Sequence, residues 1–90
     1  MNQFSDLDFK PHPAGVEGTQ AIMYFQNGFG VSVVSGRLFY TSEGGPYELA
    51  VLRKNGSIAY DTPITDDVLG HLNRNEVTEI MRQVQELENE

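Results

Sequence analysis

The chain has 90 residues, no cysteine and a formal net charge of −7 at pH 7. A chain of this length folds as one domain with one small core, for which a hydrophobic share of 39% is sufficient. The lack of cysteine excludes disulfides, thiolate metal sites and a thiol nucleophile. Residues 61–90 carry eight acidic side chains against two arginines, so the basic surface that nucleic acid requires is missing and no direct nucleic-acid partner is expected.

The N-terminal residues lack the apolar run of a signal peptide, and no segment approaches the ~20 apolar residues that cross a bilayer. We therefore expect a soluble, cytoplasmic protein with no membrane partner. Residues 1–19 are predicted to form a partly ordered arm, because Pro11 and Pro13 oppose helix formation. Its apolar side chains can dock on the body of the protein or on a partner, and residues 20–90 are predicted to form a single α+β domain.

The first predicted hairpin lies at the start of that domain. Residues 21–26 and 29–35 have strand composition and flank Asn27-Gly28, a pair typical of a type I′ turn because both residues tolerate positive φ. Gly30 lies inside the return strand, which indicates a bulge or a close approach of another part of the backbone.

The sheet is predicted to continue as a meander. Residues 37–40 form a short third segment or continue the previous strand beyond a bend, and residues 42–46 form a loop. Residues 47–52 form a strand, which we place centrally because Leu49–Leu52 is apolar on both faces. A second Asn-Gly turn lies within residues 54–57, and residues 58–60 pair back as the last strand.

Two helices are predicted to follow. Thr65 is a suitable N-cap for a short helix that begins at Asp66 and ends between Leu69 and His71, with Gly70 at its end.

The second helix runs from Arg74 to about Glu88, and Asn73 and Glu76 form a capping box at its start. Apolar residues recur along one side of it, at Val77, Ile80, Met81, Val84 and Leu87. The predicted fold is an antiparallel β-meander of four or five strands, packed by this C-terminal amphipathic helix with the short helix before it.

No residue set typical of catalysis is present, and we expect no enzyme activity, no cofactor and no metal. Asp61, Asp66 and Asp67 cluster before the last helix, where they suit a cation or small-ligand site together with His71. Their spacing lacks the regular alternation of a calcium loop, and turn formation and helix capping, which we favour, account for them without a ligand. His12 and His71 have no second ligand at metal-binding spacing.

Two features favour a protein partner. The last third of the chain is strongly acidic, and one helix covers only one face of a sheet that carries apolar residues on both. The arm, a second copy or another protein must then cover the other face. The predicted protein-binding residues are Tyr40 on the sheet and the acidic residues Asp61, Asp66, Asp67, Glu76, Glu79 and Glu86.

Three segments also resemble a group of small uncharacterised proteins of tailed bacteriophages and prophages. They are NGFGVSVV (27–34), YELAVL (47–52) and YDTPITDDVLG (60–70), and the resemblance covers residues 24–88. It implies a phage accessory protein in the bacterial cytoplasm that binds, and inhibits, a host or defence protein, and it assigns no site residues. A structural or assembly role as a homodimer or larger homo-oligomer is the alternative, and a small-ligand or enzymatic role is a second one.

Overall fold

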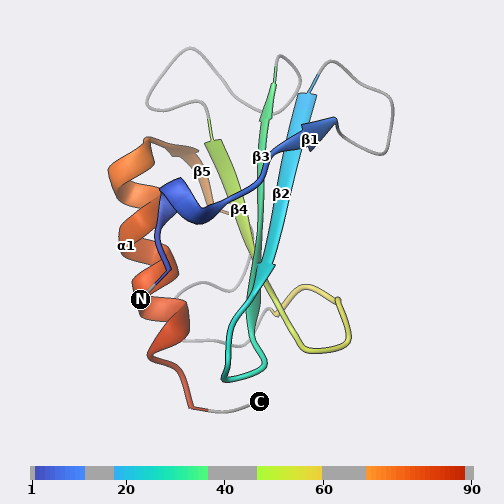
Figure 1. Ribbon diagram of the computed structural model, residues 1–90, viewed down its shortest axis with the longest axis vertical. Coiled ribbons are helices and arrows are strands. Elements are labelled where there is room, and N and C mark those ends of the chain that lie inside the picture. Colours follow the sequence, from blue (N-terminus) through green and yellow to red (C-terminus); the bar gives the residue numbers. More distant parts are fainter. Residues whose placement is uncertain (1, 12–17, 37–46, 60–68, 89–90) are drawn as a thin grey trace.

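The computed structural model describes residues 2–11, 18–36, 47–59 and 69–88. A five-stranded antiparallel sheet with its strands in sequence order packs against one C-terminal helix, which confirms the predicted α+β meander (Figure 1). The elements are the 3-10 turn η1 (Phe4–Asp6), the strands β1 (Lys10–Pro11), β2 (Gly18–Tyr24), β3 (Gly30–Gly36), β4 (Tyr47–Leu52) and β5 (Leu69–Leu72), and the helix α1 (Arg74–Gln85).

The strand register separates the side chains into two faces. Ala21, Val33 and Leu49 lie side by side across β2, β3 and β4, as do Met23, Val31 and Val51 in the next row. Both rows face α1, because successive side chains of a strand point to opposite faces. The core is formed by Phe29, Val31, Val33, Leu49, Val51, Ala59, Leu72, Val77, Met81 and Val84.

The strand β4 lies between β3 and β5, as its two-sided apolar pattern predicts. Its last four residues are all buried. Beyond β4, the predicted strand 58–60 is reduced to a single bridge between Leu52 and Ile58 and a hydrogen bond from the Ala59 N–H to the Val51 oxygen at 2.8 Å. Tyr60, residues 37–40 and residues 42–46 lie outside the described residues.

Both Asn-Gly turns are present, but neither is of type I′. In the first, the Phe25 N–H donates to the Phe29 oxygen at 2.8 Å and the Gly28 N–H to the Phe25 oxygen at 3.1 Å, so the loop has three residues. Gly28 has φ 92° and Gly56 has φ 91°, whereas neither asparagine has a positive φ. This is a type I turn followed by a glycine bulge, in which only the glycine needs the left-handed conformation. Dipeptide identity alone does not fix the loop length.

Asn27 joins the first turn to the end of α1. Its side-chain oxygen accepts the Phe29 N–H at 3.1 Å, and its side-chain nitrogen donates to the Val84 oxygen at 2.8 Å and to the Leu87 oxygen at 3.1 Å. Asn27 is buried, with 9% of its surface exposed. The last carbonyl groups of a helix have no partner within the helix, so this amide caps α1 from a turn 57 residues away in sequence.

Gly30 is required by close contact with its neighbours on β2. A Cβ atom at this position would lie 2.7 Å from the Met23 carbonyl oxygen and 2.8 Å from the Tyr24 ring. The predicted close backbone approach is therefore confirmed, and the Tyr24 ring occupies the space over Gly30.

The prediction of a short helix ending between Leu69 and His71 is wrong over those residues, which belong to β5. Pairing with β4 and burial of the Leu72 side chain outweigh the local helix signal. β5 is irregular: its register shifts opposite Tyr47–Leu49, and His71 has a φ of 59°. Thr65 and Asp66 lie outside the described residues.

The helix α1 begins with the predicted capping box. The Glu76 N–H donates to the Asn73 side-chain oxygen at 2.8 Å, and the Asn73 N–H donates to the Glu76 carboxylate at 2.9 Å. The predicted apolar stripe packs on the sheet, with Val77, Met81 and Val84 fully buried. The helix ends at Gln85, a few residues before the predicted Glu88.

The N-terminal segment packs beside α1 rather than on the other side of the sheet. The half-buried Phe4, Leu7 and Phe9 contact the core, and the Phe4 ring lies 5.0 Å from the Tyr47 ring in an edge-on arrangement. Polar contacts add to this: the Phe4 N–H donates to the Thr78 hydroxyl at 3.0 Å. In Figure 1 the segment runs from α1 across to β1. The arm therefore covers the same face of the sheet as α1. It does not cover the opposite face.

Candidate interaction surfaces

Four of the predicted protein-binding residues, Tyr40, Asp61, Asp66 and Asp67, lie outside the described residues, as does His12. The described ones are Glu76, Glu79 and Glu86, which lie exposed on the outer side of α1. His71, proposed from the sequence as part of a ligand site, is exposed on β5. Over residues 2–11, 18–36, 47–59 and 69–88, no group of three or more potential metal ligands is found.

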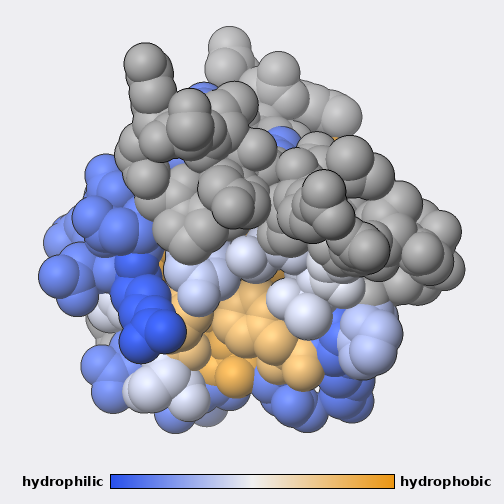
Figure 2. Space-filling view, turned by 90° about the horizontal axis from the view of Figure 1, so that it is seen from above, coloured by the Kyte–Doolittle hydropathy of each residue, from blue (hydrophilic) through white to orange (hydrophobic). Residues whose placement is uncertain are grey.

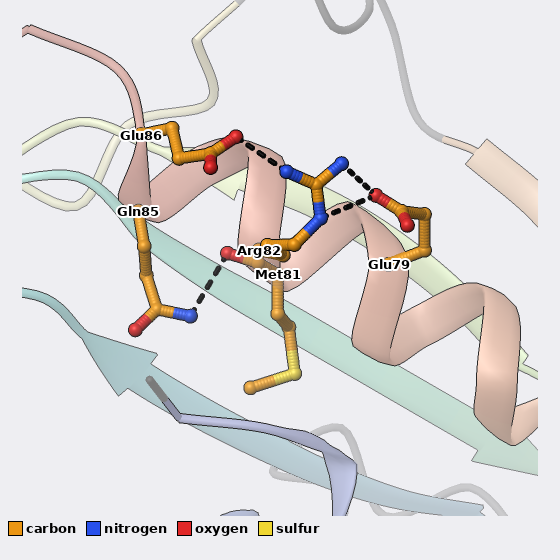
Figure 3. A network of polar contacts seen from close by, with 5 residues as sticks. All are labelled: Glu79, Met81, Arg82, Gln85 and Glu86. Carbon is orange, nitrogen blue, oxygen red and sulfur yellow. Dashed lines mark hydrogen bonds and ion pairs between the residues drawn. The ribbon is translucent and has the colours of Figure 1, made fainter.

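The acidic side chains of α1 are engaged within the helix itself. Glu76 closes the capping box. Arg82 lies between Glu79 and Glu86: its Nε donates to Glu79 at 2.8 Å, its Nη1 donates to Glu86 at 2.6 Å, and its Nη2 also contacts Glu79 (Figure 3). The outer side of α1 is therefore less negative than the acidic count suggests, because one arginine neutralises part of it.

The Glu79–Arg82 pair is exposed, so it adds little stability. The side chains are 52% and 46% exposed, and water and salt screen an ion pair in such a setting. The hydrogen bond from Arg82 lowers the pKa of Glu79, and the same bond raises the pKa of Arg82. Charges on such an exposed surface exert long-range attraction, and they do not form a shaped site.

The sheet face opposite α1 is called the second face here, and among the described residues its exposed large hydrophobic side chains are on β2. It carries Ile22 and Tyr24 of β2, next to Ser32 and Gly30 of β3. Farther across the sheet, Ala50 and Leu52 of β4 are buried, with 8% and 6% of their surface exposed. Ile22 is 54% exposed and Tyr24 is 48% exposed. Among the described residues, these two are the large hydrophobic side chains that are exposed.

Packing across the sheet holds Tyr24 in place. Its ring lies over Gly30, and its hydroxyl oxygen lies 3.6 Å from the point where a Cβ on Gly56 would be. The side chain thus reaches from β2 across β3 toward the turn that follows β4, and one side of its ring is left open. Tyr24 is a fixed apolar platform, with Ile22 two residues away on the same face.

A hollow of about 350 Å³ adjoins Ile22 where β1 separates from β2. It is lined by Asp8, Lys10, Pro11, Gln20 and Ile22. Asp8 and Lys10 have opposite charges, with 3.7 Å between the Lys10 Nζ and the Asp8 carboxylate. In the view of Figure 2, one area of apolar atoms lies at the described surface with hydrophilic side chains on either side of it.

The backbone of β2 is only partly paired on its outer side. β1 pairs with β2 at two positions, Lys10 with Gln20 and Pro11 with Thr19. No described strand lies beside the remaining residues, Ala21–Tyr24, which we call the open edge.

The direction of the backbone groups follows from the turn. The Phe25 N–H donates toward β3, and in an antiparallel ladder the bonding direction alternates from residue to residue. Met23 and Ala21 therefore bond to β3, whereas Ile22 and Tyr24 direct their N–H and C=O groups outward. Pro11 agrees with this alternation, because its position on β1 is one whose N–H would point to solvent.

The other sheet edge is protected. β5 has four residues and an irregular register, and short or distorted edge strands oppose pairing with another chain. The open edge of β2 has no charge, no proline and no bulge. The sequence predicts a strand for these residues, but Ile22 and Tyr24 are not among the predicted protein-binding residues. The available signal was that Ala21–Tyr24 is apolar on both faces.

Comparison with known proteins gives no relative: no protein-family model, curated protein or solved structure matches the chain. Among the described residues, no helix is both long enough and apolar enough to span a membrane.

Proposed function

We propose that this protein is a small, acidic, non-enzymatic interaction module that binds another protein through β2. The observation that carries the proposal is the pair Ile22 and Tyr24, which expose about half of their surface beside backbone that no described strand pairs with. An exposed apolar pair at a strand edge offers two kinds of binding at once: backbone hydrogen bonds give affinity and side-chain contacts give selectivity. Full burial of a side chain such as Ile22 contributes roughly 1.5–3 kcal/mol.

The acidic outer side of α1 has a supporting role in this proposal. Glu76, Glu79 and Glu86 all have partners within the helix, and their exposed charge attracts a basic partner over distance. Such attraction raises the association rate and weakens in high salt. The resemblance to small phage proteins supports a host or defence protein of a bacterium as the partner, and inhibition of that protein as the outcome.

A photo-crosslinking amino acid placed at position 22 tests this proposal. The matched control carries the same group at Asn75, an exposed position on α1. In bacterial lysate, we expect a discrete adduct from position 22 that excess unlabelled protein suppresses, and none from position 75. Adducts from position 75 alone, lost when Glu76, Glu79 and Glu86 are changed to lysine, would instead place binding on α1.

Self-association as a homo-oligomer is the second candidate function. The uncharged character of the open edge favours it, because the edges of two copies can meet without bringing like charges together.

A further inference from the structure

We propose that a second copy of this chain occupies the open edge, so that β2 pairs antiparallel with β2 of the second copy. This rests on the proposed use of β2 as the interaction surface, and it develops the second candidate function, self-association. The dimer has a twofold axis, and the two five-stranded sheets join into one.

The register of this pairing follows from which backbone groups point outward. Gln20 already pairs with Lys10, so Ile22 and Tyr24 are the outward-pointing positions within the open edge. The arrangement that uses both places Ile22 opposite Tyr24 of the second copy and the two Met23 residues opposite each other at the axis. Each Ile22–Tyr24 pair exchanges two backbone hydrogen bonds. It also sets a β-branched side chain against an aromatic ring on the second face, a favourable cross-strand pair.

The charge distribution favours a copy over a foreign basic segment. Residues Ala21–Tyr24 are neutral, and Asp8 and Lys10, which line the hollow beside Ile22, have opposite charges. The open edge itself has no row of carboxylates that a basic segment could bind. The repulsion between two copies, each of charge −7, is therefore long-range and is screened within about 8 Å at physiological salt. Salt consequently strengthens the dimer, whereas it weakens binding of a basic partner.

Four backbone bonds and two apolar pairs make a small interface. Interfaces of this size belong to the weak class, and we expect a dissociation constant on the order of 10–100 µM.

Sedimentation of the full chain from about 1 µM to about 1 mM, at low and high salt, tests the proposal. We expect the dimer fraction to rise with concentration and with salt. Ile22→Lys places a charge in the paired edge and raises the dissociation constant at least about tenfold. Thr19→Lys, on the same strand but opposite β1, changes it less than about twofold.

A cysteine at the axis provides a second readout, because the native chain has none. Met23→Cys places two thiols at a directly opposed, non-hydrogen-bonded position, where Cα atoms lie about 4.5 Å apart. We expect its disulfide dimer to form at least about tenfold faster than that of Thr19→Cys under mild oxidation. A monomer at all concentrations and salts, or equal rates for the two cysteine variants, would overturn the dimer. An adduct of position 22 with a host protein would still support the proposed function in that case.

Discussion

Replacing Asn27 by aspartate removes two hydrogen-bond donors from the end of α1 while it keeps the oxygen that accepts the Phe29 N–H. The new carboxylate faces the Val84 and Leu87 carbonyl oxygens, which the native amide contacts at 2.8 and 3.1 Å. Asn55 provides the matched control. It occupies the equivalent place in the second turn, its oxygen accepts the Ser57 N–H at 3.0 Å, and it is exposed.

The expected loss of stability follows from these contacts. Each lost hydrogen bond costs about 0.5–1.5 kcal/mol, and a negative charge at a helix C-terminus adds about 0.3–1 kcal/mol or more when partly buried. We expect Asn27→Asp to lose about 2–4 kcal/mol, and Asn55→Asp to stay within about 0.5 kcal/mol of the native protein. Since 1 kcal/mol shifts the melting temperature of a domain this size by about 4–8 °C, thermal unfolding resolves the difference.

The pH dependence gives a further check. Burial beside carbonyl oxygens raises the pKa of the new carboxyl in the folded state. The folded protein then holds a proton that the unfolded chain has lost, so the penalty is small below pH about 4 and grows as the pH rises through the folded pKa. Equal melting temperatures for the two aspartate variants at neutral pH would refute the role of Asn27 as the cap of α1.

Three other variants test the fold and the acidic surface. Gly30→Ala should lose about 1–3 kcal/mol in denaturant unfolding because its Cβ meets a backbone oxygen, whereas Gly70→Ala, with its nearest contact at 3.8 Å, should not; equal costs would contradict the close approach. Phe4→Ala should lose about 1–3 kcal/mol and make the arm a faster protease target, since the ring contacts two aromatic neighbours; unchanged proteolysis would contradict the packing. Arg82→Gln should return the pKa of Glu79, followed by NMR, toward its ordinary value; because that pKa is lowered in the native protein, the small stabilisation is present at neutral pH and is lost as the pH falls through it.

Local sequence was sufficient for the elements whose cause is local. The capping box of Asn73 and Glu76 and the apolar stripe of α1 lie within one stretch of chain, and both are observed. Local sequence was not sufficient where contacts with residues distant in the sequence determine the structure. The residues Leu69–Leu72 have turn and helix signals, but pairing with β4 makes them a strand. Asn27 reads as a turn residue, and only the fold brings it to the end of α1.

The candidate surface shows the same limit. The strand composition of Ala21–Tyr24 predicts a strand, but the exposure of Ile22 and Tyr24 depends on where β1 stops pairing and on which face the arm covers. The residues of β2 alone determine neither the end of the β1 pairing nor the face that the arm covers. The acidic residues of α1 were visible in the sequence, and their partnership with Arg82 follows from helical spacing.

Amide hydrogen exchange along β2, resolved residue by residue in dilute protein at low salt, tests the central claim most directly. If β2 has an open edge, the Ile22 and Tyr24 amides exchange much faster than those of Ala21 and Met23, which bond to β3. Their exchange then slows when the protein is concentrated or when a partner binds. Protection of Ile22 and Tyr24 equal to that of Met23 in the dilute monomer would contradict the account, because the edge would then already be paired.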